Sequence, residues 1–330
     1  MGAVSGSLHA QGNSEAAFER VREVQLQHTA ILMAQEGVLG TAIGLNERGQ
    51  PALAILLERP GIAGIPKWLD GVPVEPVVTG KIYAVPKPEN PGGKDKPGQP
   101  SNETNPKKRF DRPVPIGVST GNVESCSAGT IGCRVTDGSN VYALSNNHVY
   151  ALENTATEGS NVVQPGLYDT KPPCRVYPEN VIGTLADYVK LEFDGTPNYV
   201  DAALALTDTA RLGNATPVNG YGVPNSTTTQ ASIGLRVQKY GRTTGLTKGS
   251  VSLTDATVVV SYGSVDATFE HQIIITPSTF SGAGDSGSLI VTDDPKKNPV
   301  GLLFAGSSTV TVANPIDFVF ALLGVWIDDE

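Results

Sequence analysis

A serine in a glycine-rich turn is the residue of this chain whose surroundings most suggest chemistry. Ser286 lies in the segment 280–290, FSGAGDSGSLI, which runs from a turn into an apolar strand. A hydroxyl group is a poor nucleophile unless a base takes its proton and backbone N–H groups face the negative charge that develops. Glycine permits the tight backbone that presents such N–H groups. The segment therefore predicts a nucleophile, provided that a base and an acid lie elsewhere in the chain.

The candidate base is His148, one of four histidines. It ends the strand-like run 141–149, VYALSNNHV, so its imidazole would project into a cleft from the end of a strand. The sequence surroundings of the other three histidines indicate no catalytic role for them. His9 lies in a polar N-terminal stretch, His28 lies in a helix-like segment, and His271 stands at the entry to an apolar strand.

The candidate acid is Asp201, within the run 199–206, YVDAALAL. A carboxylate buried at the start of an apolar strand is costly unless strong hydrogen-bond donors surround it. This cost favours a functional position for Asp201. Ordinary surface turns explain Asp187, Asp194 and Asp208.

The three candidates follow one another as His, Asp and Ser, the order of the chymotrypsin-like arrangement among serine hydrolases. The strings around them, LSNNHV, VDAAL and GDSGS, together with GRTTG at 241–245, resemble the trypsin/chymotrypsin superfamily of serine peptidases. The resemblance covers about residues 114–330 and is to bacterial members. It implies a mainly β fold, a chymotrypsin-like double β-barrel with a C-terminal helix. It also implies peptide-bond hydrolysis, with proteins or peptides as substrates.

The resemblance gives each residue a role. Ser286 would attack the carbonyl, His148 would carry the proton, and Asp201 would hold the imidazole and stabilise its charged form. The N–H groups of Gly284 and Ser286 would form the oxyanion hole. Asp285 would fix the active-site loop through a donor that the sequence does not identify.

The resemblance also places a substrate pocket near Phe280, Phe304 and Gly306. Phe280 stands where trypsin-type enzymes have an aspartate, so it gives no reason to expect a preference for Lys or Arg. The chain departs from its secreted relatives after the histidine, where Val149 and Tyr150 replace a bridged cysteine. The turn at 241–245 is interpreted as structural and close to the cleft.

Ahead of this region, residues 14–84 predict a small α+β domain. Apolar residues at helical spacing within 15–35 predict an amphipathic helix. Runs at 38–45 and 52–57, joined by a hairpin-like connection, predict strands, and 72–84 predicts one or two more. The apolar positions of the predicted helix are Phe18, Val21, Val24, Leu26, Ile31 and Leu32.

A flexible Pro-rich linker, residues 85–113, is expected next, because seven prolines among polar residues leave little apolar surface to bury. The peptidase-like domain would span 114–330. Its closing helix is expected after Asn314, an N-cap type of residue followed by proline. Strands are expected near residues 129–136, 141–146, 181–191, 201–206, 235–240, 249–260, 271–276, 287–292 and 300–305.

Composition excludes several classes of function. A formal charge of −9 disfavours nucleic acid as a partner, because phosphate binding needs clustered Lys and Arg. The longest apolar stretch, 318–327, is far too short to cross a membrane. No metal-ligand spacing occurs, so we expect no metal and no cofactor. The sequence leaves a homo-oligomer open.

Three cysteines, Cys126, Cys133 and Cys174, are too few for a disulfide framework. We expect buried free thiols, with a Cys126–Cys133 bridge as the alternative. The N-terminus lacks the basic start and apolar core of a secretory signal, so we expect a cytoplasmic location.

Alternatives to an active peptidase remain. One is a catalytically silent scaffold or binding module whose N-terminal domain recruits partners. Another is a latent peptidase, in which the 14–84 domain blocks or chaperones the cleft until the chain is cut near Lys107–Arg109.

Overall fold

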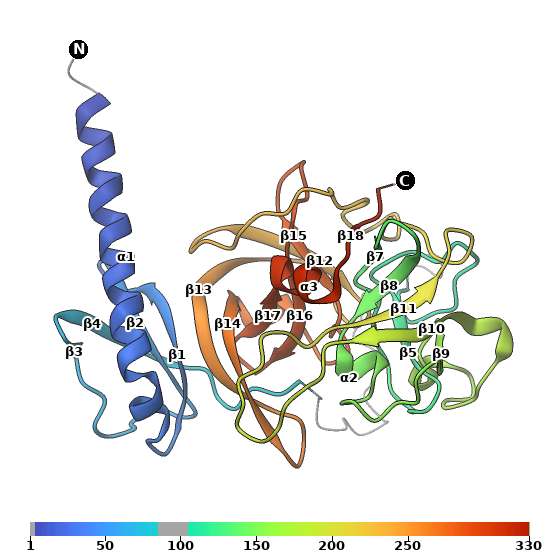
Figure 1. Ribbon diagram of the computed structural model, residues 1–330, viewed down its shortest axis with the longest axis horizontal. Coiled ribbons are helices and arrows are strands. Elements are labelled where there is room, and N and C mark those ends of the chain that lie inside the picture. Colours follow the sequence, from blue (N-terminus) through green and yellow to red (C-terminus); the bar gives the residue numbers. More distant parts are fainter. Residues whose placement is uncertain (1–3, 85–104, 330) are drawn as a thin grey trace.

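The computed structural model describes residues 4–84 and 105–329, with side chains from residue 15 onward. One long helix and a few short strands stand at one end of the molecule, and two curled sheets form the rest (Figure 1).

The sheet that contains strands β12 to β17 closes into a barrel, called the second barrel below. Its strands run in the order β12-β15-β16-β17-β14-β13, and an additional pairing of β12 with β13 joins the two ends. Large apolar side chains fill the interior, among them Phe269 and Phe304, whose ring centroids are 4.7 Å apart. The strands are β12 Arg236–Gly241, β13 Gly245–Ser261, β14 Asp266–Thr276, β15 Leu289–Thr292, β16 Pro299–Gly306 and β17 Thr311–Pro315.

The other sheet, which contains strands β5 to β11 and β18, also curls on itself and is called the first barrel below. Residues 129–136 pair with β5 at one end and with β8 at the other, so the two sides of the sheet meet. The strands of this sheet, in the order β18-β7-β8-β11-β10-β9-β5-β6, are β5 Ser119–Asn122, β6 Gly129–Thr130, β7 Cys133–Thr136, β8 Val141–Ser145, β9 Asn161–Val163, β10 Val181–Tyr188, β11 Ala203–Thr207 and β18 Trp326–Ile327. Short helices α2 Asn147–Tyr150, η1 Leu167–Asp169 and η2 Pro178–Asn180 lie between them, and η3 Ser278–Phe280 precedes β15.

The C-terminal helix is α3, Ile316–Leu323. A mainly β double barrel with a closing helix, as predicted, is confirmed. The predicted N-cap is wrong, because the helix begins after Pro315 and Asn314 is the penultimate residue of β17. The Asn314 side chain instead accepts a hydrogen bond from the Asp201 N–H at 3.1 Å.

The N-terminal region contains α1 Val4–Met33, β1 Val38–Leu45, β2 Pro51–Leu57, β3 Trp68–Leu69 and β4 Val72–Val78. This region shares a sheet with the second barrel, because β1 pairs with the far half of the 17-residue strand β13. The α+β content matches the expectation. The separation of 14–84 as a domain of its own stays a prediction.

The apolar positions of α1 do not all face the strands. Val21, Val24 and Leu32 are buried against β1 and β2. Leu26 and Ile31 are 75% and 71% exposed, which corrects the predicted apolar face. At 100° per residue Leu26 falls about 160° from Val24, on the opposite side of the helix, whereas Ile31 lies within about 20° of Val24 and is exposed all the same.

Most of the predicted linker, 85–104, lies outside the described residues. The rest of it, 105–113, is held against the first barrel. Arg109 donates to the Asn180 side chain at 3.0 Å, and the Phe110 N–H donates to the Gln164 side chain at 3.0 Å. Packing on this barrel therefore begins before the predicted boundary at 113.

The cysteine expectation is wrong for two of the three residues. Cys126 and Cys174 form a disulfide, although 48 residues separate them in sequence. The chain returns from β9 through η1 to bring the two segments together, and no local pattern foretells this. Cys133 is a buried free thiol, and burial raises its pKa well above the usual range.

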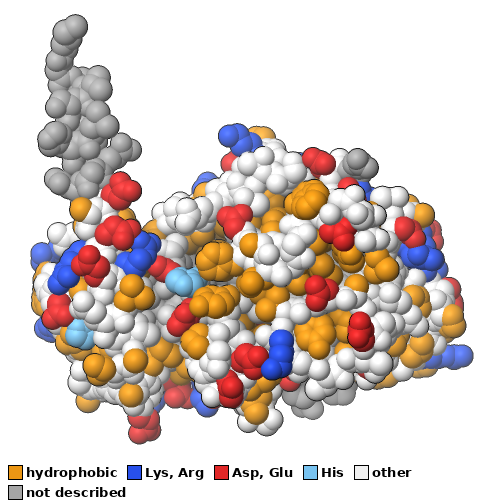
Figure 2. Space-filling view, viewed as in Figure 1, with side chains coloured by type: hydrophobic (Ala, Val, Ile, Leu, Met, Phe, Trp, Pro, Cys, Tyr) orange, Lys and Arg blue, Asp and Glu red, His pale blue; other side chains and the backbone are white. Residues whose placement is uncertain are grey.

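Charged side chains of both signs gather around the lower part of α1, where it meets the strands (Figure 2). An ion pair between two of these side chains connects α1 to the second barrel: Arg22 Nε lies 2.9 Å from Asp255 Oδ2 on β13. Within the described ranges, none of the helices combines the length and the apolarity that a membrane crossing requires.

Candidate active site

His148 and Asp201 lie in direct contact. β8 ends at Ser145, and the following turn of helix, α2, carries His148. Asp201 stands just before β11, which pairs with β8 along its whole length. This pairing brings the two segments side by side and sets His148 Nδ1 2.6 Å from Asp201 Oδ2.

The Asp201 carboxylate is fully buried, and donors surround it. Its Oδ1 accepts the backbone N–H of His148 at 3.1 Å, in addition to the ring contact at Oδ2. Tyr262 donates its hydroxyl hydrogen to Oδ2 at 2.7 Å. These bonds offset the cost of removing a charge from water. They also fix the orientation of the imidazole, because the backbone bond prevents the carboxylate from turning.

Tyr262 is a site residue that sequence reasoning missed. It follows the end of β13, packs edge-on to the His148 ring with centroids 6.2 Å apart, and is 4% exposed. Burial, followed by the charge and hydrogen bond of Asp201, raises the pKa of Tyr262 well above its ordinary value. It therefore stays protonated and acts as a donor. No motif surrounds it, so only its position in the fold reveals the role.

Ser286 lies in the loop between η3 and β15 and is 8% exposed. This loop is joined to the His148 side of the molecule through Thr130 on β6. The Thr130 N–H donates to Ser286 O at 2.8 Å, and Thr130 O accepts the Ser145 hydroxyl at 2.8 Å. The loop that carries Ser286 is thus linked through two hydrogen bonds to the strand that leads into His148.

Glycines on either side of Ser286 are required by the backbone. Gly284 has φ of 93° and Gly287 has φ of 92°, a region that other residues rarely adopt. A side chain at Gly284 would collide with the Arg242 guanidinium, and one at Gly287 with the carbonyl of Thr130. The predicted need for glycine in this turn therefore has two physical causes, conformation and close approach.

Asp285 is fully buried and holds the loop. The buried ammonium of Lys239, on β12, lies 3.3 Å from Asp285 Oδ2. Further donors are the N–H of Thr243 at 2.8 Å, the N–H of Thr244 at 3.2 Å with its hydroxyl at 2.6 Å, and the N–H of Gly282 at 3.0 Å. The donor that the sequence left unidentified is an internal lysine, supported by the turn at 241–245.

The same turn connects the two barrels. Arg242 makes a two-pronged ion pair with Asp169 of η1, with distances of 2.6 and 2.7 Å. Asp169 also accepts the Ser119 hydroxyl at 2.6 Å. Paired bonds between guanidinium and carboxylate fix geometry as well as energy. The turn is structural, as interpreted from the sequence, and it holds the loop that carries Ser286 and η1 together.

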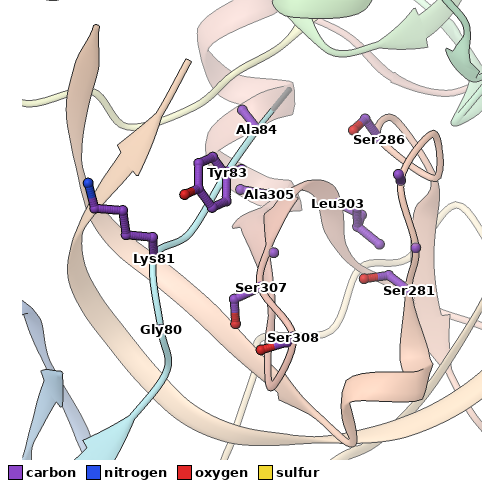
Figure 3. Close-up of a pocket in the computed structure, with 13 residues that line it drawn as sticks. Gly80, Lys81, Tyr83, Ala84, Ser281, Ser286, Leu303, Ala305, Ser307 and Ser308 are labelled. Carbon is purple, nitrogen blue, oxygen red and sulfur yellow. The ribbon is translucent and has the colours of Figure 1, made fainter. Parts of the chain in front are cut away.

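A cavity of about 450 Å³ opens at Ser286. Residues 281–283 and the end of β16 line it on one side, and Lys81 and Tyr83 line it on the other (Figure 3). Of the three predicted pocket residues, Gly306 lines this cavity. Phe280 and Phe304 do not line it. Both are fully buried in barrel cores, Phe280 beneath Lys239 and Phe304 against Phe269.

Among known proteins, no family model matches this chain. No curated protein matches it either. Several solved serine proteases align with it. A glutamic acid-specific serine protease is 19% identical and aligns over 65% of this chain and 100% of its own, with a TM-score of 0.47. Thermobifida fusca protease A is 18% identical over 65% of this chain and 99% of its own, at 0.46. Cellulomonas bogoriensis chymotrypsin is 18% identical over 67% and 100%, at 0.42.

The class of this protein follows from its own architecture. Two curled antiparallel sheets, a closing helix and a loop carrying GDSG between them define a chymotrypsin-like, protease-like scaffold.

Proposed function

We propose that this protein is a serine endopeptidase that cleaves peptide bonds through an acyl-enzyme. The observation that carries the proposal is the fully buried carboxylate of Asp201, which is bonded to both the ring and the backbone of His148. A buried acid that holds an imidazole at Nδ1 leaves Nε2 to act as a base. Ser286, on the adjoining loop and open to the cavity, supplies the nucleophile.

In this mechanism His148 takes the hydroxyl proton of Ser286 as its oxygen attacks the substrate carbonyl. Asp201 stabilises the imidazolium, and the proton then passes to the leaving amine. The N–H groups of Gly284 and Ser286 would receive the oxyanion, a contribution of about 3–4 kcal/mol per donor in enzymes of this kind. Lys239 and Asp285 hold the loop that presents these N–H groups.

Covalent labelling tests the proposal. An alkyl fluorophosphonate should modify the folded protein at Ser286, as located by peptide mass mapping. Ser286→Ala should abolish both labelling and hydrolysis, with turnover lower by up to ~10⁶. Ser308→Ala is the matched control, because Ser308 lines the same cavity and should keep full labelling. Labelling elsewhere, or near-normal hydrolysis by pure Ser286→Ala, would exclude this nucleophile.

A catalytically silent scaffold is the alternative, and it predicts no labelling of the folded chain. The arrangement around Asp201 favours the enzyme, because a binding module gains nothing from an acid buried behind an imidazole.

A further inference from the structure

Residues 80–84 cross from the N-terminal strands to the edge of the second barrel. The segment is extended and bonded on both sides. Tyr83 exchanges two backbone hydrogen bonds with Gly306, N–H to O at 2.9 Å and O to N–H at 3.0 Å. On its other side, Ile82 O accepts the Ser261 N–H at 2.8 Å and the Ala84 N–H donates to Ser261 O at 3.1 Å. It lies as a short extra strand between β16 and the end of β13.

Side chains of this segment alternate in burial, as in a strand. Ile82 and Ala84 are 1% and 3% exposed and pack into the barrel core. Lys81, Tyr83 and Ala84 are among the residues that line the cavity containing Ser286 (Figure 3). The segment is therefore anchored by two apolar side chains and forms part of the lining of the candidate active site.

The edge that Tyr83 occupies continues directly from the nucleophile loop. β15 covers β16 as far as Leu302, and the backbone of Leu303 is then bonded to residues 287 and 288. Gly306, three residues further on, gives both of its backbone groups to Tyr83. On the opposite side β16 is paired with β17.

An extended peptide binds to a sheet by adding a strand to a free edge, and its main chain then supplies much of the affinity. A peptide that brought a carbonyl to Ser286 while lying along β16 would need the N–H and C=O of Gly306. These groups accommodate one extended chain at a time. Tyr83 occupies the Gly306 N–H and C=O. Because its segment belongs to the same chain, its effective concentration at Gly306 is high compared with that of a free peptide.

We propose that residues 80–84 occupy the main-chain docking edge for peptide substrates and act as a built-in competitor of substrate. This inference rests on the proposed function. It predicts that the segment weakens binding of extended peptides and leaves the reactivity of Ser286 toward small reagents unchanged. The competing interpretation is a permanent wall of the substrate site, whose loss would weaken peptide binding.

Full-length variants separate the two interpretations. Tyr83→Pro removes the N–H that donates to Gly306, whereas Tyr83→Ala also loses the aromatic side chain but keeps the N–H and serves as the control. The probes are an alkyl fluorophosphonate and the best-cleaved hexapeptide from a random fluorogenic library. We expect KM for the hexapeptide to be at least tenfold lower in Tyr83→Pro than in Tyr83→Ala, with the labelling rates of the two variants within twofold of each other. An unchanged or higher KM with normal labelling would overturn the inference.

A measurement on the unaltered protein avoids any folding defect of the proline variant. Hydrogen exchange at the Tyr83 amide would be compared after inactivation with the alkyl fluorophosphonate and with a phosphonate carrying the hexapeptide sequence. We expect exchange to become at least tenfold faster with the peptidyl reagent alone, because the peptide displaces Tyr83 from Gly306. Equal protection in both adducts would overturn the inference. Failure of both reagents to label Ser286 would instead refute the proposed function.

Discussion

The phenol of Tyr262 donates to the same carboxylate oxygen of Asp201 that contacts the His148 ring, at 2.7 and 2.6 Å respectively. This bond joins the second barrel to a pair of residues carried by the first, because Tyr262 follows β13 whereas His148 and Asp201 flank β8 and β11. The imidazole of His148 and the carboxylate of Asp201 are thus oriented by both halves of the fold.

Tyr262→Phe removes this donor and keeps the ring. We expect kcat/KM for peptide hydrolysis to fall by about 10- to 100-fold, since a hydrogen bond to a charged group contributes about 1.5–3 kcal/mol. Tyr177→Phe is the matched control, because its hydroxyl bonds a surface carbonyl, Lys171 O, far from the cavity. Equal activity of the two variants would show that Tyr262 does not position Asp201.

Asp201→Asn should reduce kcat by about 10⁴, because the neutral amide cannot stabilise the imidazolium or hold the reactive tautomer. Asp208→Asn is the control, since Asp208 pairs with Arg211 at the surface and should be silent. Steady-state kinetics on one peptide substrate would check both. A larger loss in Asp208→Asn would identify a different acid.

Lys239→Met leaves the buried Asp285 carboxylate without its cation. Burial already lowers the pKa of Lys239, and the Asp285 charge opposes this effect. We expect the free energy of unfolding to drop by about 3–5 kcal/mol, because one member of a buried ion pair is removed. Hydrolysis should fall with it, since the loop carrying Ser286 loses its anchor.

Two comparisons make this result specific. Adding Asp285→Asn to Lys239→Met should recover part of the lost stability, because no unpaired charge then remains buried. Lys248→Met removes an ion pair whose lysine is 56% exposed and should cost under about 1 kcal/mol. Urea denaturation of the four proteins gives the values, and equal losses for both lysine variants would contradict the anchoring role.

Cys126→Ser with Cys174→Ser should lower stability by about 4 kcal/mol, from the entropy of the loop that the disulfide closes. Thermal unfolding of the wild-type protein with and without reductant measures this loss of stability. In the double variant, reductant should cause no further loss.

Trapping free thiols in cell extracts tests the location of the protein. Disulfides persist in oxidising compartments, so a reduced pair would favour the cytoplasmic location, which stays a prediction.

Stability should also depend on His271. The hydrogen bond that the His271 ring donates to Asp255 raises the pKa of His271, and the same bond lowers the pKa of Asp255. A raised histidine pKa stabilises the fold fully below the ordinary value of about 6.5 and loses this contribution as pH rises through the folded value. We expect the melting temperature to fall over that range in wild type. In His271→Gln this dependence should flatten, and an unchanged slope would exclude His271 as its source.

Much of the architecture was predictable from local pattern. Alternation and turn residues placed the strands at 38–45 and 141–146 within a residue or so, because these runs carry their own periodicity. Short strands such as β5 and β9 were missed, since STGN and NVV show no clear alternation. The helix at 15–35 was expected, but its buried face was assigned too broadly at Leu26 and Ile31.

For the candidate site, the sequence by itself determined which functional groups are available: a serine between glycines, a histidine at a strand end, and an aspartate before an apolar strand. The types and order of these residues are local properties, and they are visible without coordinates.

Tertiary structure decided what surrounds them. Lys239 opposite Asp285, Tyr262 behind Asp201, the Cys126–Cys174 bridge and Tyr83 on Gly306 each join segments that lie far apart in the chain. The periodicity of the sequence cannot predict such contacts. They form only when the two sheets close and when residues 80–84, from outside the barrels, pair with the edge of β16. Burial of Phe280 and Phe304 has the same cause, since a closed barrel fills its interior with its largest apolar side chains.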